Sequence, residues 1–287
     1  MSALTLVTGI TGQQGGAVAR SLLSTGHRVR GYVRDPGSDK AKALAGQGVE
    51  LAKGDLTDPV ALLAAMRGVD TVFAMTTPFE AGPESEVTQG RAMIEAATQA
   101  GVSHFVYNSV ASADQATGIP HFDSKFEVEQ ELAASELTWT VVAPVYFMEN
   151  LLFPQTVEGL EGGVYAIPMP SDTKLQQIPV QDIGNFSAHV IRNRDAFAGK
   201  RIDIASDELS AAETATKLAS TLNKPLTTVE VPIEQIRSFS EDLAVMYEWF
   251  VTTGYSADIE ALRREHPDVG WRRFDEWAGQ AVPDSLS

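Results

Sequence analysis

Three glycines at a spacing of three residues, Gly9, Gly12 and Gly15, follow a short apolar run near the start of the chain. A strand that ends in such a turn and opens a helix lets the backbone approach a pyrophosphate, whose charge then lies at the positive end of the helix. The same turn also serves close helix–strand packing, and the spacing alone is a weak signal. Its place between a first strand and a first helix favours dinucleotide binding, with contacts from Gly9, Thr11, Gly12, Gln13, Gln14 and Gly15.

Two charged residues, Arg34 and Asp35, come directly after the second predicted strand. At this place in a dinucleotide-binding fold an arginine accepts the 2′-phosphate of NADP, whereas an acidic residue holds the free ribose diol of NAD. Arg34, with Lys40 nearby, has the charge to neutralise a phosphate dianion, although basic residues at strand ends also simply coat the surface. We therefore expect NADP(H) rather than NAD(H), and an inward-turned Asp35 would indicate NAD(H).

The third and fourth predicted strands also end in polar or turn-forming residues. Asp55 and Leu56 follow the third strand, and Asp55 either accepts from the adenine amino group or caps the next helix. Thr76, Thr77 and Pro78 follow the fourth strand, where they line the nicotinamide-side diphosphate and ribose or simply form a turn. Open α/β sheets bind their ligands at the carboxyl ends of the strands, which favours the binding interpretation.

Short apolar runs alternate with alanine-rich segments of helical period over the first part of the chain, which is typical of βαβ units in a parallel sheet. Several predicted strands are continuous apolar runs, as burial on both faces requires. Predicted strands lie at residues 4–8, 28–33, 49–52, 71–74, 104–108 and 138–143. Predicted helices lie at residues 17–24, 40–45, 59–66, 84–99 and 123–134.

After Pro144 this alternation breaks down, and residues 154–179 are rich in proline and glycine. Further helices are predicted at residues 182–192 and 211–222, and further strands at residues 201–205 and 227–231. The sequence thus predicts an α/β protein: a doubly wound parallel sheet in residues 1–145, with a smaller, irregular α/β lobe on the substrate side in residues 146–287 packed against it.

Charge and composition exclude several classes of site. The 22 lysines and arginines against 38 aspartates and glutamates give a net charge of −16, which repels phosphate backbones, so we expect no direct nucleic-acid binding. The absence of cysteine excludes disulfides, zinc–thiolate sites and cysteine nucleophiles. The five histidines lie far apart in sequence, so we expect no metal. No apolar run is long enough to span a membrane, and we expect a cytoplasmic protein.

The chain resembles the NmrA-like family, an atypical branch of the short-chain dehydrogenase/reductases, in six segments: VTGITGQQGGAVARSLL, GYVRDP, KGDLTD, NSVAS, HFDSKFEVEQ and APVYFMENLL. The resemblance runs along most of the chain. It implies a Rossmann fold that binds NAD(P). The family is functionally mixed, and it includes NADP-binding redox sensors, transcriptional co-regulators and NADPH-dependent quinone reductases.

The resemblance leaves the residues for proton transfer incomplete. Typical members of the larger superfamily use Ser, Tyr and Lys, with a YxxxK pair that places the phenol and the ammonium on one helix face. Lys125 is present and Ser109 matches the serine, but His121 stands where the tyrosine would be. Lys125 is expected to bind the nicotinamide ribose or carboxamide or, alternatively, to be a solvated lysine on the helix surface. His121 is a candidate proton donor or, alternatively, a helix cap or surface residue.

A second aromatic segment, with Tyr146, Phe147 and Asn150, resembles the family segment that closes over the nicotinamide. Tyr146 is the alternative proton donor. Tyr146 and Phe147 could instead pack the junction between the lobes, and Asn150 either hydrogen-bonds the cofactor or caps the next turn.

These observations predict an NADP(H)-binding oxidoreductase that reduces a quinone or a similar small acceptor by direct hydride transfer. A readily reduced quinone needs less help from a positioned acid than a ketone does, which suits the missing tyrosine. The rival hypothesis is a nonenzymatic redox sensor that acts through a protein partner, because the cofactor binds two conformations unequally. A third hypothesis, an isomerase or epimerase, is disfavoured by the missing tyrosine.

Overall fold

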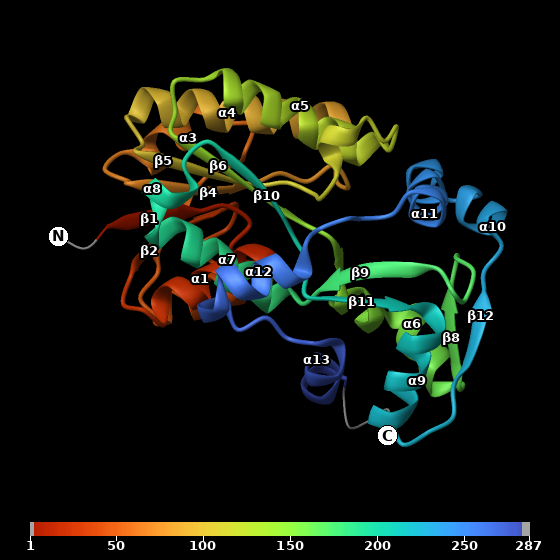
Figure 1. The fold of residues 1–287 in the computed structure, drawn as a ribbon. Coiled ribbons are helices and arrows are strands. Elements are labelled where there is room, and N and C mark those ends of the chain that lie inside the picture. The colour runs from red at the N-terminus through yellow and green to blue at the C-terminus, as the bar shows by residue number, and fades with distance from the viewer. Residues whose placement is uncertain (1–2, 283–287) are drawn as a thin grey trace. The chain divides into compact units, whose positions relative to one another are not determined.

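The computed structural model describes residues 3–282 and contains a seven-stranded sheet (Figure 1). The strand order is β10-β6-β5-β4-β1-β2-β3, the order of doubly wound nucleotide-binding folds with β10 added at one edge. The pairings from β3 across to β6 are all parallel. The predicted doubly wound α/β fold is confirmed. The strands are β1 (Leu4–Val7), β2 (Arg28–Val33), β3 (Glu50–Lys53), β4 (Thr71–Met75), β5 (His104–Asn108), β6 (Trp139–Pro144) and β10 (Lys200–Ile204).

Helices cover both faces of this sheet (Figure 1). One face carries α3 (Pro59–Met66), α4 (Pro83–Ala100) and α5 (Pro120–Ala134), and the other carries α1 (Gln13–Leu23) and α7 (Val180–Arg192). The main apolar core lies under α3, α4 and α5, where side chains such as Leu62, Met93 and Phe105 are fully buried. Burial of this apolar area supplies most of the stability of such a layer. The remaining short helices are α2 (Asp39–Gly46), α8 (Arg194–Phe197) and η1 (Ala113–Gln115).

The first helix begins inside the glycine turn. Gly12 is its N-cap and α1 starts at Gln13, whereas the alanine-rich pattern predicted a start at residue 17. Glycine is a poor helix former, so the sequence pattern does not mark this first turn as helical. The consequence is that the first N–H groups of α1 lie in the glycine turn itself.

Contacts divide the chain into two compact units. The first holds the described residues up to Asp114, His121–Ala143 and Ile183–Ile202; the second holds Gln115–Pro120, Pro144–Asp182 and the described residues from Asp203 on. The domain boundary expected after residue 145 stays a prediction. The sequence pattern did not indicate that residues 183–202 return to the first unit.

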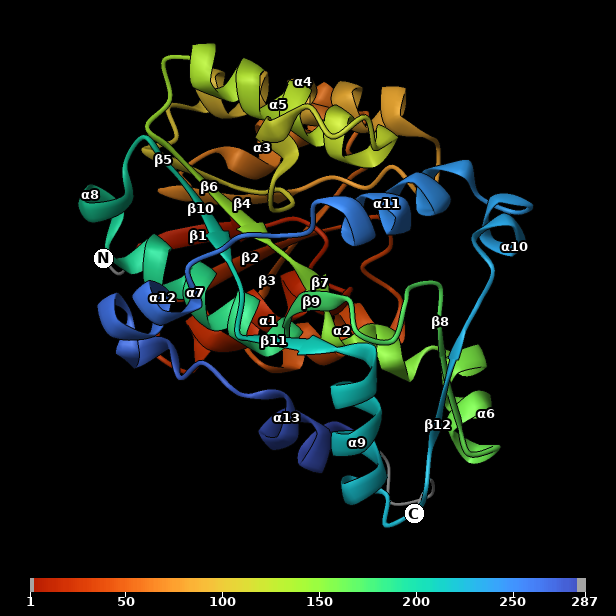
Figure 2. The ribbon, with the colours of Figure 1, turned by 45° about the vertical axis from the view of Figure 1, so that its right-hand side comes forward.

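The second unit contains two small sheets (Figure 2). One has the order β11-β9-β7, and the other pairs β12 with β8 in parallel. The stretch at 154–179 is less irregular than its composition suggests, because it contains a helix and two strands that are each too short to show a clear period. The strands are β7 (Tyr146–Phe147), β8 (Val164–Ile167), β9 (Lys174–Ile178), β11 (Asp207–Ser210) and β12 (Thr227–Glu230). The helices are η2 (Met148–Leu152), α6 (Pro154–Glu161), α9 (Ala211–Thr221), α10 (Ile233–Arg237), α11 (Glu241–Thr252), α12 (Ile259–Glu265), η3 (Pro267–Val269) and α13 (Phe274–Ala281).

Candidate functional site

The glycine turn lies at the carboxyl end of β1 and is too tightly packed for side chains. Gly9 has a φ of 60°, and a Cβ added there would lie 2.4 Å from Sδ of Met75. A Cβ added at Gly15 would lie 2.5 Å from the carbonyl oxygen of Gly9, which is backbone and does not yield easily. Gly12 closes the turn by donating its N–H to the Gly9 carbonyl at 2.9 Å. Thr11, Gly12 and Gln13 are exposed, so the open side of the turn is free of covering side chains.

A hydrogen bond joins the turn to the end of β5. Asn108 donates its Nδ2 to Oε1 of Gln14 at 2.8 Å. Asn108 is only 3% exposed, yet its Oδ1 has no hydrogen-bond partner among the described residues. A buried acceptor left unsatisfied costs about 1–3 kcal/mol, and a ligand hydroxyl or amide would satisfy it.

The residues at this edge fit a nicotinamide dinucleotide. The N-cap of α1 is Gly12, which has no side chain to cap the first turn, and a diphosphate could accept from the N–H groups there. A Cβ at Gly15 would fill the glycine turn. Oδ1 of Asn108, which has no partner among the described residues, could accept from a sugar hydroxyl or from the N–H of a carboxamide. The contacts predicted for individual residues of the turn stay predictions.

Arg34, the residue expected to accept a 2′-phosphate, is already paired with an acid. Its Nη1 and Nη2 lie 3.0 and 3.3 Å from the two carboxylate oxygens of Glu80, which follows β4. Both side chains are exposed, at 70% and 60%. Asp35 instead accepts the backbone N–H of Gly37 at 2.8 Å, which closes the turn after β2. Glu80 therefore competes with any phosphate for the guanidinium of Arg34.

Asp55 does not cap the helix that follows it, so that interpretation is wrong. Its Oδ1 accepts from the N–H and the hydroxyl of Thr57 at 3.0 and 2.7 Å, and these hydrogen bonds lower the pKa of Asp55. The cap of α3 is Asp58, whose Oδ1 accepts two backbone N–H groups of the first turn at 3.0 Å each. Leu56 packs against the apolar core. The adenine contact of Asp55 stays a prediction.

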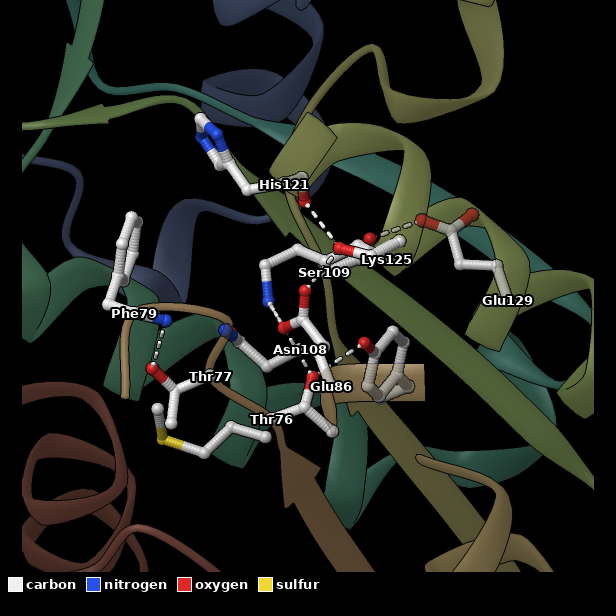
Figure 3. A network of polar contacts seen from close by, with 12 residues as sticks. Thr76, Thr77, Phe79, Glu86, Asn108, Ser109, His121, Lys125 and Glu129 are labelled. Atoms are coloured by element: carbon white, nitrogen blue, oxygen red, sulfur yellow. Dashed lines mark hydrogen bonds and ion pairs between the residues drawn. The ribbon is translucent and has the colours of Figure 1, made fainter. Parts of the chain in front are cut away.

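A buried polar network joins the ends of β4 and β5 to α5 (Figure 3). Glu86, in the first turns of α4, is fully buried and accepts from the hydroxyl of Thr76 at 2.7 Å and from Nζ of Lys125 at 2.6 Å. Its second oxygen accepts from the hydroxyl of Ser124 at 2.6 Å. The Thr76 hydroxyl also lies 2.9 Å from the phenol oxygen of Tyr107. The structure thus brings the predicted residues Thr76 and Lys125 together through an acid that was not predicted.

The loop after β4 carries the remaining predicted residues of this edge. Thr77 accepts the backbone N–H of Phe79 at 3.4 Å, and Pro78 accepts a backbone hydrogen bond that closes the turn.

Phe79 is 73% exposed, and its ring centroid lies 5.7 Å from that of His121 (Figure 3). His121 lies in the first turn of α5, is 7% exposed and contacts Phe122 edge to face at 4.8 Å, so its interpretation as a surface residue is wrong. Its catalytic role stays a prediction.

Ser109 has a structural partner. Its hydroxyl donates to Glu129, a buried acid on α5 that also pairs with Arg201 at 2.8 Å. Burial raises the pKa of Glu129, and the bonds from Arg201 and Ser109 oppose that shift. The hydroxyl of Ser109, which matches the family serine, thus makes its hydrogen bond with a buried acid.

Tyr146, Phe147 and Asn150 belong to the second unit. Tyr146 and Phe147 form β7, which pairs in parallel with β9, and Asn150 lies in η2. The phenol oxygen of Tyr146 lies 3.4 Å from that of Tyr247, and burial raises the pKa of Tyr146. The raised pKa makes the phenol a weaker acid than a free tyrosine. The predicted contacts of these three residues with a cofactor stay predictions.

The described residues contain neither a metal-binding cluster nor a membrane-spanning helix. Between residues 3 and 282 there is no group of three or more His, Asp or Glu side chains placed to hold a metal ion. Within the same range no helix has both the length and the apolar character needed to cross a membrane. Cytoplasmic location stays a prediction.

Three residues of this edge were missed by the sequence analysis: Glu80, Glu86 and Asn108. Glu86 had a usable signal, because it falls on the same helical stripe as Gly90, Met93 and Ala97, all of which are buried. A charged residue on a buried stripe needs a partner, and Lys125 on the next helix is the partner. Asn108 directly precedes Ser109, and only the fold shows that it contacts the glycine turn.

The doubly wound sheet and the glycine turn between β1 and α1 define a Rossmann-like α/β protein. The chain belongs to the NmrA-like family, whose model matches residues 1–278. The resemblance seen in the sequence is thereby confirmed.

Two relatives and one solved structure illustrate the family. The NAD(P)H azoreductase of Xenophilus azovorans is 31% identical over 234 residues, which cover 81% of this chain and 78% of the relative. Quinone oxidoreductase 2 of Escherichia coli (strain K12) is 33% identical over 220 residues, which cover 76% and 73%. A crystal structure of the NADPH-dependent quinone oxidoreductase QOR2 of Escherichia coli, complexed with NADPH, superposes with a TM-score of 0.82 at 26% identity and covers 98% of this chain and all of that one.

Proposed function

We propose that this protein is an oxidoreductase that uses NADPH to reduce a quinone or another readily reduced small acceptor. The observation that carries the proposal is the tightly packed glycine turn at the carboxyl end of β1, together with a largely buried Lys125 that Glu86 ties to Thr76 at the end of β4, and with histidine in place of tyrosine at position 121. When bound, the nicotinamide supplies a hydride, and one further proton completes the two-electron reduction of a quinone to a hydroquinone. An acceptor that takes the hydride readily depends little on a strong positioned acid.

The proposal gives four places in the first unit a part in binding the cofactor. The turn around Gly12 binds the diphosphate, Arg34 binds the 2′-phosphate and thereby selects NADPH, and Lys125 and Asn108 hold the nicotinamide end of the cofactor. Protein groups at this edge orient the cofactor and exclude water, and they form no covalent bond with it. The proton comes from Tyr146, whose phenol stays protonated at neutral pH, or from His121.

The choice of acceptor is supported by the names of two relatives. One is an NAD(P)H azoreductase and the other a quinone oxidoreductase. Quinones and azo compounds are both conjugated and readily reduced. The proposed substrate class is therefore a conjugated small acceptor, with a quinone as its first representative.

The test follows the loss of NADPH absorbance, with NADH in parallel, against a panel of quinones, azo compounds and activated carbonyl compounds. We expect turnover with at least one quinone and a preference for NADPH. Cofactor binding is measured separately by fluorescence quenching. Tight binding without turnover across the panel would overturn the oxidoreductase proposal and favour a redox sensor, and a preference for NADH would overturn the role of Arg34.

Two variants then locate the proton donor. Tyr146→Phe and His121→Ala each remove one candidate, and we expect the rate to fall at least tenfold in one of them, a loss of about 1.4 kcal/mol of transition-state stabilisation. The control is Tyr32→Phe, which removes a phenol that donates to the backbone carbonyl of Asp55. Unchanged rates in both variants would show that solvent supplies the proton.

A further inference from the structure

Glu86 is the buried centre of the polar network in Figure 3, and the proposed function does not yet use it. Its side chain is fully buried, and both carboxylate oxygens accept hydrogen bonds. An isolated carboxylate in such a place would be strongly disfavoured, so its partners must hold it. The three partners, Thr76, Ser124 and Lys125, come from the end of β4 and from α5, so one carboxylate ties a cofactor-lining loop to the helix that carries the lysine.

The ammonium of Lys125 depends on this carboxylate. Lys125 has a side-chain exposure of 12%, and the only acid that pairs with it among the described residues is Glu86, at 2.6 Å. Asp123 and Glu127 flank it on α5 but are exposed and lie on other faces of the helix. Without Glu86 the lysine would be a nearly buried cation with no counter-charge.

The same pair leaves the ammonium able to bind a ligand. One of its three protons is directed to Glu86, and the described residues provide no further hydrogen-bond partner for the other two. The oxygen that accepts from Lys125 also accepts from Thr76, which fixes the ammonium beside the end of β4. A lysine stem has four rotatable bonds, and this ion pair selects one of its many conformations.

We infer that Glu86 is a positioning residue for Lys125: it holds the ammonium at the end of β4 so that its two remaining N–H groups face the nicotinamide ribose or carboxamide. The inference rests on the proposed function, because the contact of Lys125 with the cofactor is part of that proposal. It assigns to α4 a role in cofactor binding that the family motifs of the sequence did not indicate.

A double-mutant cycle on NADPH binding tests the inference. Glu86→Gln keeps the shape and one acceptor oxygen, which can serve Thr76 or Ser124 but not both, and it removes the charge; Lys125→Met removes the ammonium. We expect Glu86→Gln to weaken NADPH binding about tenfold in the presence of Lys125 and less than about twofold in the Lys125→Met background. The apparent KM for NADPH should rise with it, while the KM for the acceptor stays unchanged.

Ser124→Ala is the matched control. It removes a hydrogen bond to the same buried carboxylate without touching the lysine. We expect it to lower stability but to change NADPH binding less than about threefold, with no coupling to Lys125→Met. If Glu86→Gln weakens binding equally in both backgrounds, Glu86 only supports the fold and the inference is overturned.

A measurement on the unaltered protein covers the case in which Glu86→Gln does not fold. The ¹⁵N-labelled ammonium of Lys125 is followed by NMR while NADP⁺ is added. We expect a resolved signal, because the bond to Glu86 slows proton exchange, and a shift of that signal at saturation. Saturable binding without a shift would overturn the inference alone, whereas no binding of NADPH or NADH would overturn the proposed function and the inference with it.

Discussion

Pairs of charged residues that are distant in sequence define this edge of the sheet. Lys125 was predicted from its place in a motif, but its partner Glu86 was not, and Arg34 was predicted without Glu80. A motif reports which residue types recur at fixed local spacing, whereas an ion pair between two helices depends on how the helices pack. Local spacing therefore indicated Arg34 and Lys125 as candidate residues, but it did not indicate the acids with which they pair.

The pair of Arg34 and Glu80 leads to a prediction about cofactor choice. Glu80→Gln removes the competitor for the guanidinium, and we expect NADPH to bind about threefold more tightly while NADH binding is unchanged. The effect is small because an exposed ion pair contributes only about 0–1 kcal/mol. Fluorescence titration with both cofactors measures it.

Glu84→Gln is the matched control for this prediction. Glu84 is also exposed at the start of α4, but no ion pair with Arg34 is recorded for it among the described residues. If both variants tighten NADPH binding equally, the effect comes from overall charge and not from release of Arg34. A similar gain for NADH would lead to the same conclusion.

At the scale of elements, the sequence predicted strands better than helix starts. All six strands predicted before Pro144 are present, because continuous apolar runs such as Leu4–Val7 are buried on both faces. The start of α1 was misplaced, since its first turn consists of glutamines and glycines whose helical state depends on the packing of the glycine turn. The strands β8 and β9 were missed because they lie in the stretch 154–179, whose proline and glycine content suggests irregular structure.

Close contact between α1 and α7 gives a prediction at this scale. A Cβ added at Gly184 on α7 would lie 2.6 Å from the backbone carbon of Ala17 on α1, so the two helices meet backbone to backbone. We expect Gly184→Ala to lower the free energy of unfolding by about 1–3 kcal/mol, because the helices must move apart. Urea denaturation measures the change.

Gly279→Ala provides the control with the opposite sign. Gly279 lies inside α13, and nothing within 4 Å would meet an added Cβ. Alanine favours the helix, so this variant should be more stable by about 0.5–1 kcal/mol. Equal loss of stability in both variants would show that the contact with Ala17 is not what constrains Gly184.

For the whole molecule, one buried histidine leads to a prediction about the dependence of stability on pH. His104 on β5 is fully buried with its Nε2 2.9 Å from the hydroxyl of Thr140, and burial lowers the pKa of His104 to about 4 from 6.5. Between these two pH values the unfolded chain binds a proton that the folded protein does not. The free energy of unfolding therefore falls as the pH is lowered from 6.5 toward 4, by an amount on the order of 3 kcal/mol.

His104→Gln isolates this contribution, since glutamine offers a polar group near Nε2 but does not titrate. The difference in unfolding free energy between the unaltered protein and the variant should decrease as the pH falls through this window. The buried acids Glu129 and Asp182, whose pKa values burial raises, act in the opposite sense and cancel in the difference. A difference that is constant from pH 7 to pH 4 would contradict the prediction.

The class of fold was accessible from the sequence because the alternation of strands and helices repeats along the chain. The division of the chain into two units was not accessible from the sequence, because residues 144–182 belong to the second unit and residues 183–202 belong again to the first. Such a return depends on which strand edge is open, and no local pattern records it. The same limit applies to the candidate site, where the sequence placed the glycine turn but not the hydrogen bond from Asn108 to Gln14.

The position of β10 beside β6 has a consequence for synthesis on the ribosome. β6 ends at Pro144, but the strand that covers its outer edge begins only at Lys200. While the intervening residues are being translated, β6 presents unpaired backbone groups to any other nascent chain. We therefore expect the nascent chain to be most prone to aggregate through this edge before β10 has been translated.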